Sequence, residues 1–187
     1  MRTLFDALEP RRSVFDHAKT DTVWNLGDLD SINVEEFFAE NYVTEQGRRV
    51  GIEFLRHQAR QLRFGNALIN FAGVDYQKMH SPYLKGAGQL IVPGALNVML
   101  SHNPDVFPVA AAQGYHLTIA GHTHGGQVDV EILHQHIDPA RYFTPFIQGL
   151  YRRENSSVYV SNGLGTIGVP VRLGAPPEVS VLRLCAI

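Results

Sequence analysis

The chain has 187 residues, of which 44% are hydrophobic and 18% are charged, and this length suits a single domain that buries roughly 70% of its unfolded surface. The formal net charge of −2 excludes the basic field of a nucleic-acid-binding protein, and no apolar run of about 20 residues is present to cross a membrane. One cysteine, Cys185, excludes a disulfide framework, so we expect a cytoplasmic protein, with peripheral membrane attachment left open.

The first half of the chain predicts one helix and one β-hairpin. Apolar residues recur at helical spacing across residues 34–50, which predicts a helix that ends near Gly47. Residues 60–64 and 67–74 then flank Gly65-Asn66, a dipeptide that accepts positive φ angles. This arrangement predicts a hairpin with a two-residue turn.

The second half alternates strand and helix patterns. Residues 95–101 and 116–121 are short apolar runs typical of buried strands, and residues 103–114 between them begin and end with helix-boundary signals. Residues 157–163 and 178–184 predict two further strands. We therefore expect an α/β fold over residues 1–187, a single domain built as a layered sandwich of mixed β-sheets flanked by helices.

Histidines follow the two buried strands at matched positions. His102 comes directly after the first strand, and His122 and His124 come after the second, beside glycines that permit a tight turn. Loops at the carboxyl ends of parallel strands meet at one edge of a sheet, and neutral imidazole is a common metal ligand. The pattern predicts a metal site. The alternatives are ordinary surface or capped histidines and a purely structural metal, whereas one cysteine excludes a zinc finger.

These motifs also carry a family resemblance. SHNPD at 101–105, GHTHGGQV at 121–128 and the run from Val158 to Leu184 resemble the bacterial GHTHGGQ-type branch of the calcineurin-like metallophosphoesterases. The resemblance covers residues 47–184, whereas residues 1–46 are degenerate. It implies the metallophosphoesterase fold, incomplete at the N-terminus, and hydrolysis of a phosphomonoester or phosphodiester at a binuclear centre of Mn, Zn or Fe.

The resemblance assigns His102 and His122 to one metal ion and His124 to the other. Asp28 is the upstream candidate ligand and has two interpretations. It is either the bridging aspartate of a Gly-Asp motif or the asparagine position of an altered Gly-Asn-His motif, in which Leu29 replaces the general-acid histidine. The spacing to Gly51 favours the second interpretation, and a solvated turn aspartate stays the alternative to both.

Leu29 cannot donate a proton to a leaving group, so no general acid is assigned. The alternatives to an active hydrolase are therefore a non-catalytic metal-binding pseudoenzyme and an incomplete gene product lacking the upstream motifs. The resemblance implies a small phosphorylated substrate, lipid- or nucleotide-linked, and no nucleic-acid partner. Asn162, Gly163 and Arg141 are the candidate substrate contacts.

Overall fold

The computed structural model describes residues 47–78, 82–128, 130–132, 135–137, 139–166 and 170–185, and the chain packs as two compact units, 1–54 and 55–187. In the first unit, residues 47–49 are helical and the chain turns at Gly51, whose φ is 84°. The rest of the predicted helix, and Asp28 with it, lie outside the described residues. The single domain over residues 1–187 stays a prediction.

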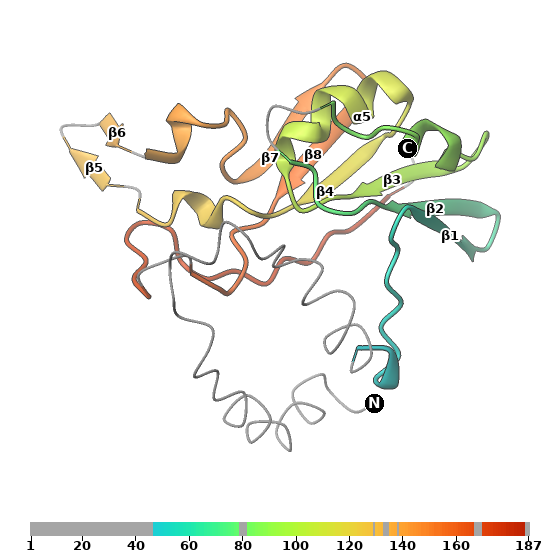
Figure 1. The fold of residues 1–187 in the computed structure, drawn as a ribbon, viewed down its shortest axis with the longest axis horizontal. Coiled ribbons are helices and arrows are strands. Elements are labelled where there is room, and N and C mark those ends of the chain that lie inside the picture. The colour runs from blue at the N-terminus through green and yellow to red at the C-terminus, as the bar shows by residue number, and fades with distance from the viewer. Residues whose placement is uncertain are drawn as a thin grey trace. The chain divides into compact units, whose positions relative to one another are not determined.

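A six-stranded mixed sheet forms the centre of the second unit, in the order β1-β2-β3-β4-β8-β7 (Figure 1). Its strands are β1 (Gln58–Phe64), β2 (Ala67–Gly73), β3 (Leu96–Leu100), β4 (Leu117–Ala120), β7 (Gly149–Arg153) and β8 (Ser156–Val160). The four inner strands β2, β3, β4 and β8 run parallel, and the edge strands β1 and β7 are antiparallel to their neighbours. A separate hairpin joins β5 (Val130–Ile132) to β6 (Gln135–Ile137).

The predicted hairpin at the start of this unit is confirmed. β1 and β2 pair antiparallel from Gln58 opposite Gly73 to Phe64 opposite Ala67, with Gly65 in the turn at φ 58°. All seven residues of β1 are exposed, whereas the last two residues of β2 are buried. β2 is therefore the first strand along the chain whose carboxyl end is buried.

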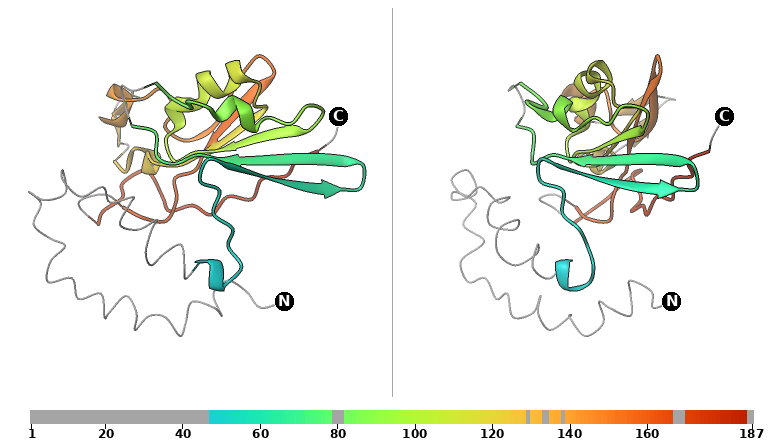
Figure 2. Two further views of the ribbon diagram at one scale, coloured as in Figure 1. Left: turned by 45° about the vertical axis from the view of Figure 1, so that its right-hand side comes forward. Right: turned by 90° about the vertical axis from the view of Figure 1, so that its right-hand side faces the viewer.

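The connection from β3 to β4 is helical, as predicted. A 3-10 turn, η4 (Pro104–Val106), leads into α5 (Phe107–Gln113), and Gly114 at φ 102° ends the helix. The side chain of Asn103 caps η4 by accepting a hydrogen bond of 2.9 Å from the Asp105 backbone N–H. α5 covers one face of the sheet (Figure 2). There Phe107 packs with Val158 and Val160 of β8.

The remaining helical segments are short. They are the 3-10 turns η3 (Ala87–Leu90), η5 (His124–Gly126) and η6 (Pro139–Tyr142). In the described part of the chain, none of the helices has both the length and the apolar character needed to cross a bilayer.

The α/β class is confirmed, but the strand predictions need three corrections. The strand expected at 178–184 does not form: the described residues there are irregular, and Val181 is 92% exposed. A strand needs a hydrogen-bonding neighbour, and none of the described strands pairs with this segment. Sequence patterns also missed β7 and the β5–β6 hairpin. β7 joins β8 through Glu154-Asn155, which is not a typical hairpin-turn dipeptide.

Candidate functional site

The carboxyl ends of the parallel strands bring the predicted histidines to one edge of the sheet. His102 follows β3 by two residues, and His122 follows β4 by two residues. Backbone hydrogen bonds tie the two loops together, because Ser101 N–H donates to the Ile119 carbonyl at 3.1 Å and Gly121 N–H donates to the His102 carbonyl at 3.2 Å. The histidine side chains therefore sit on two loops with a fixed spacing.

The imidazoles of His102 and His122 face each other directly. Nε2 of His102 lies 3.0 Å from Nδ1 of His122, and the ring centroids are 4.7 Å apart. Two nitrogens bound to one tetrahedral ion at about 2.0–2.1 Å each would be about 3.3 Å apart, so a shift of a few tenths of an ångström admits an ion between them. The pair fits two ligands of a single divalent ion.

His124 is oriented by a different contact. Its Nδ1 lies 2.9 Å from the carbonyl oxygen of Gly165, which leaves Nε2 on the other side of the ring. Among the residues that the structure describes, no group of three or more His, Cys, Asp and Glu side chains has the spacing of a metal site. The described residues thus supply a converging histidine pair and one neighbouring histidine, and a full coordination shell requires further ligands.

The loop that carries His122 and His124 has an unusual backbone. The φ angles of His122, His124 and Gly125 are 74°, 54° and 64°, in the left-handed region that side chains other than those of Gly, Asn, Asp and His rarely adopt. At the two histidines such a conformation costs about 1–3 kcal/mol each and persists where the surrounding structure fixes it, most often at functional sites, whereas glycine adopts it freely. The strain is consistent with a loop shaped for binding.

Electrostatics favour the neutral imidazole, which is the form that binds metals. Partial burial lowers the pKa of His102, and the neighbouring His122 and His124 lower it further. Burial also lowers the pKa of His122, although the carboxylate of Asp105 acts in the opposite direction. Both members of the pair therefore lose their protons more readily than free histidine does.

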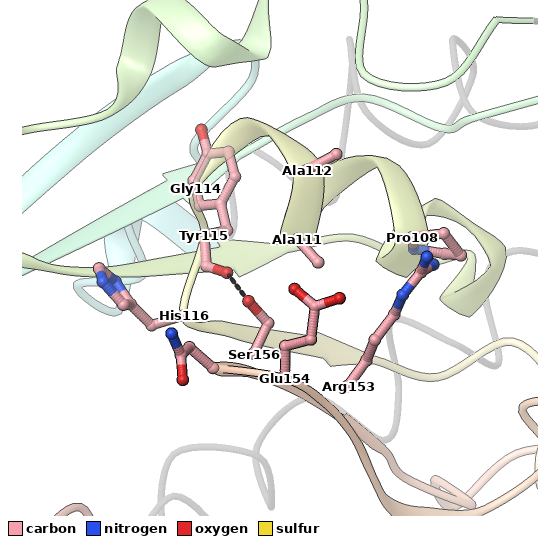
Figure 3. A pocket seen from close by; sticks show the side chains of 10 residues that line it. Pro108, Ala111, Ala112, Gly114, Tyr115, His116, Arg153, Glu154 and Ser156 are labelled. Atoms are coloured by element: carbon pink, nitrogen blue, oxygen red, sulfur yellow. Dashed lines mark hydrogen bonds between the residues drawn. The ribbon is translucent and has the colours of Figure 1, made fainter.

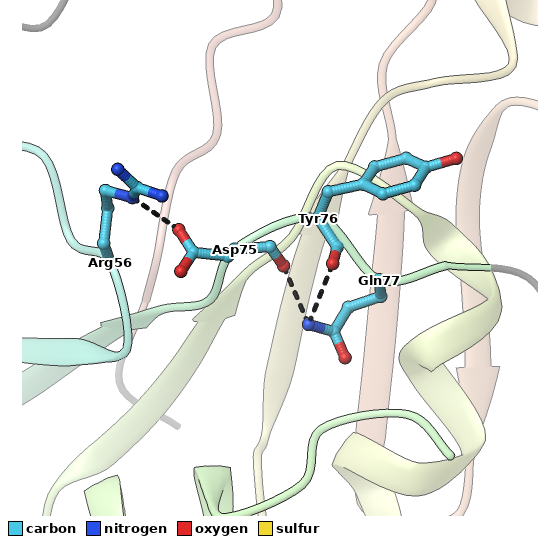
Figure 4. A network of polar contacts seen from close by, with 4 residues as sticks. All are labelled: Arg56, Asp75, Tyr76 and Gln77. Atoms are coloured by element: carbon cyan, nitrogen blue, oxygen red, sulfur yellow. Dashed lines mark hydrogen bonds and ion pairs between the residues drawn. The ribbon is translucent and has the colours of Figure 1, made fainter. Parts of the chain in front are cut away.

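An aromatic residue that sequence reasoning missed lies beside the pair. The ring centroid of Tyr76 is 6.1 Å from that of His102 and 6.4 Å from that of His122. Tyr76 follows the carboxyl end of β2, and the parallel pairing of β2 with β3 brings it to the same edge of the sheet as His102. Before it, Asp75 accepts a hydrogen bond of 2.7 Å from Arg56, which holds the end of β2 in place (Figure 4).

The predicted substrate contacts occupy different positions. Asn162 follows the carboxyl end of β8 and is only 7% exposed, and its buried Oδ1 has no hydrogen-bond partner among the described residues. Gly163 adopts a φ of 64° and receives a hydrogen bond from Arg172 on its carbonyl. Arg141 lies exposed on η6. The roles of all three as substrate contacts stay predictions.

A pocket of about 430 Å³ lies away from the histidines (Figure 3). His116, Ser156, Arg153 and Glu154 are among the residues that line it, and they come from the start of β4, the start of β8 and the β7–β8 turn. The pocket is therefore at the amino ends of β4 and β8, whereas His122 and Asn162 follow their carboxyl ends. It does not enlarge the histidine site.

A hydrogen-bonded cluster fixes the segment after Pro177 against β8. The hydroxyls of Tyr159 and Ser180 both donate to the Glu178 carboxylate, and the Asn162 backbone N–H lies 3.4 Å from its second oxygen. The hydrogen bonds from Ser180 and Tyr159 lower the pKa of Glu178. An ionised Glu178 therefore anchors the chain beside Asn162.

We expect the Glu178→Gln variant to lower the melting temperature at pH 7 by about 2–4 °C, corresponding to about 1 kcal/mol for weakened hydrogen bonds to a charged group. The folded pKa of Glu178 lies below its ordinary value of 4.5, so its stabilisation is complete above that value and disappears as the pH falls through the folded pKa. Thermal denaturation at pH 7 and at pH 3 measures the difference, with the exposed Glu154→Gln as control. A difference of equal size at both pH values would contradict the prediction.

Comparisons with known proteins give partial relatives. The chain is 31% identical over 139 residues to the uncharacterized protein YpbG of Bacillus subtilis, which is 72% of this chain and 49% of YpbG. It is 29% identical over 116 residues to the uncharacterized metallophosphoesterase YkuE of Bacillus subtilis (62% of this chain, 40% of YkuE). It is 32% identical over 87 residues to the phosphodiesterase YaeI of Escherichia coli (46% of this chain, 32% of YaeI).

The chain thus spans about half the length, or less, of these curated relatives. No protein-family model matches the chain, and no solved structure matches it significantly.

Proposed function

Because the chain is homologous to bacterial metallophosphoesterases, we propose that it is a metal-dependent hydrolase of phosphate esters. The observation that carries the proposal is the facing pair of imidazoles, with Nε2 of His102 3.0 Å from Nδ1 of His122. The loops at the carboxyl ends of an α/β sheet are also where such folds bind ligands.

In this proposal His102 and His122 hold one divalent ion, and His124 holds a second. Asp28, outside the described residues, is the proposed carboxylate ligand. The chemistry supplied by bound ions is positive charge that stabilises the developing charge on the phosphate, together with a lowered pKa of water. Imidazole and carboxylate ligands suit manganese, zinc or iron. We further propose that the sheet belongs to the layered sandwich of this family.

The protein side chains orient the ligands and shape the entrance to the site. The lowered pKa values of His102 and His122 keep both rings neutral near pH 7, so they are available as electron-pair donors. Tyr76 places an aromatic ring beside the pair, on the side reached from β2. We propose a lipid- or nucleotide-linked phosphate as the substrate, with Tyr76 as the contact for an apolar or aromatic leaving group.

The test is hydrolysis by the full chain. Chelated protein is mixed with p-nitrophenyl phosphate or bis(p-nitrophenyl) phosphate, and Mn²⁺, Zn²⁺ or Fe²⁺ is added back in turn. We expect turnover that is absent after chelation and returns with at least one ion. Metal content is measured by elemental analysis on the same samples. Protein that binds metal and hydrolyses neither ester with any of the three ions would refute the catalytic proposal.

A second candidate, a non-catalytic metal-binding protein, is favoured by one specific observation. The described residues bring two histidines into direct contact but supply no group of three or more metal ligands. Leu29, in the place proposed for the general-acid histidine, points the same way. About one ion per chain without turnover supports this candidate, whereas about two ions with turnover excludes it.

A further inference from the structure

The guanidinium of Arg172 makes several hydrogen bonds in the loop beside His124. Its N–H groups donate to five backbone carbonyls. Nε donates to Gly165 at 3.0 Å, and Nη1 donates to His124 at 3.0 Å and to Ala175 at 3.1 Å. Nη2 donates to Asn162 at 2.8 Å, to Gly163 at 3.2 Å and also to Gly165. A guanidinium has five N–H donors in a planar fork. The five carbonyl oxygens equal these donors in number, with Gly165 on Nε, two carbonyls on each Nη, and the Gly165 carbonyl also shared by Nη2.

These carbonyls come from segments far apart in the sequence. Arg172 joins the loop after β4, which carries His124, to the loop after β8, which carries Gly163 and Gly165. Lysine has three donors on a single nitrogen and cannot reach five acceptors spread around a plane. The arrangement thus requires arginine and fixes the two loops relative to each other.

The contact between Gly165 and His124 indicates which ring nitrogen carries the proton. A carbonyl oxygen only accepts, so a hydrogen bond across this 2.9 Å contact places the proton on Nδ1 of His124. Nη2 of Arg172 also lies near Nδ1, but at 3.4 Å. If Nη2 donated to Nδ1, the ring proton would be on Nε2 instead. The shorter distance favours Nδ1–H donating to the Gly165 carbonyl, which leaves the lone pair on Nε2.

We propose that Arg172 is a positioning residue: it holds the Gly165 carbonyl against His124 and so fixes the imidazole with Nε2 free to bind a divalent cation. A histidine that binds a metal through one nitrogen commonly donates the other N–H to a backbone carbonyl, and that partner fixes the tautomer and the ring orientation. Here the carbonyl belongs to a glycine-rich loop that Arg172 ties down. The inference rests on the proposed function only in taking a divalent ion as the ligand.

The first test reads the tautomer of His124 directly and uses a variant only to assign the resonance. Long-range ¹H–¹⁵N NMR spectra of the metal-free full chain at pH 8 distinguish a protonated Nδ1 from a protonated Nε2. His124→Gln, which removes the signal, assigns the resonance. We expect the Nδ1–H form at His124, and the Nε2–H form would overturn the inference.

The second test measures Mn²⁺ binding by titration calorimetry. Loss of a partner of this kind typically weakens metal affinity by about 10- to 100-fold, so we expect such a loss in Arg172→Ala and a partial recovery in Arg172→Lys. Arg152→Ala, which removes an exposed arginine of β7, is the matched control and should bind as the unaltered chain does. Thermal denaturation shows whether each variant is folded.

The outcomes separate this inference from the proposed function. Folded Arg172→Ala with unchanged Mn²⁺ affinity overturns the positioning role even if the chain hydrolyses phosphate esters. A chain that binds Mn²⁺ and hydrolyses nothing fails as an enzyme, yet a weakened Arg172→Ala still supports the positioning role. If the unaltered chain binds no Mn²⁺, the proposed metal site fails. The His124 tautomer in Arg172→Ala, compared with that in the unaltered chain, then decides whether Arg172 orients His124, and an unchanged tautomer overturns the positioning role.

Discussion

We expect the His122→Ala variant to lose most of its bound divalent metal and, with it, hydrolysis of phosphate esters. Nδ1 of His122 faces Nε2 of His102 at 3.0 Å, so the substitution removes one of two nitrogens that converge on the same point. Removing an outer partner of a metal ligand already costs about 10- to 100-fold in affinity, and removing the ligand itself should cost more than about 100-fold. Elemental analysis and Mn²⁺ titration of the purified variant measure the loss.

The matched control is His57→Ala. Both histidines have a positive φ, 74° at His122 and 49° at His57, so both substitutions put alanine into a left-handed backbone conformation. His57 precedes β1 and is exposed. The control thus has the same unfavourable backbone conformation for alanine but leaves the histidine pair intact. It should bind metal as the unaltered chain does. If His122→Ala retained the metal content of the control, the histidine pair would not be a metal site.

The second large effect is expected at Gly125. Alanine there should destabilise the protein by about 3 kcal/mol and weaken metal binding, since two costs add. A φ of 64° costs an L-residue about 1–2 kcal/mol, and an added Cβ would lie 2.6 Å from Oδ1 of Asn162, an overpacking that costs about 1–3 kcal/mol. Denaturant unfolding gives the stability, and Mn²⁺ titration reports on the loop that carries His122 and His124.

Gly65→Ala separates the two costs. Gly65 has a φ of 58°, and an added Cβ meets nothing within 4 Å, so this substitution carries only the backbone cost. The double variant Gly125→Ala/Asn162→Gly removes the side chain that clashes and should recover the steric part of the loss. Equal destabilisation by Gly65→Ala and Gly125→Ala, or no recovery in the double variant, would show that Asn162 does not confine the loop.

Local patterns predicted the parts of the fold that depend on neighbours in the chain. The hairpin follows from Gly65-Asn66 between two strand patterns, and α5 follows from the boundary signals at Asn103 and Gly114. The strand-end rule also located His102 and His122, because parallel strands align their carboxyl ends. The segment at 178–184 has the composition of a strand, but composition cannot supply the neighbouring strand that hydrogen bonding requires.

Contacts between distant segments were beyond local patterns. Tyr76 lies 26 positions before His102, and only the parallel pairing of β2 with β3 brings the ends of these strands together. Arg172 is 48 positions after His124, inside a run that reads as an ordinary loop, and its five carbonyl acceptors are visible only once the backbone is folded. No residue pattern predicts such a hub, because backbone carbonyls are the same in every sequence.

The sequence by itself determined the chemistry available to this protein: three histidines after buried strands, glycines where the backbone must turn, and the motifs of a metallophosphoesterase relative. Only the tertiary structure decided which nitrogens converge, since Nδ1 of His122 meets Nε2 of His102 while Nδ1 of His124 is engaged by Gly165. The physical reason is that residue type fixes which atoms can bind a metal, whereas the direction of each lone pair depends on φ and on hydrogen bonds from segments far away in the chain.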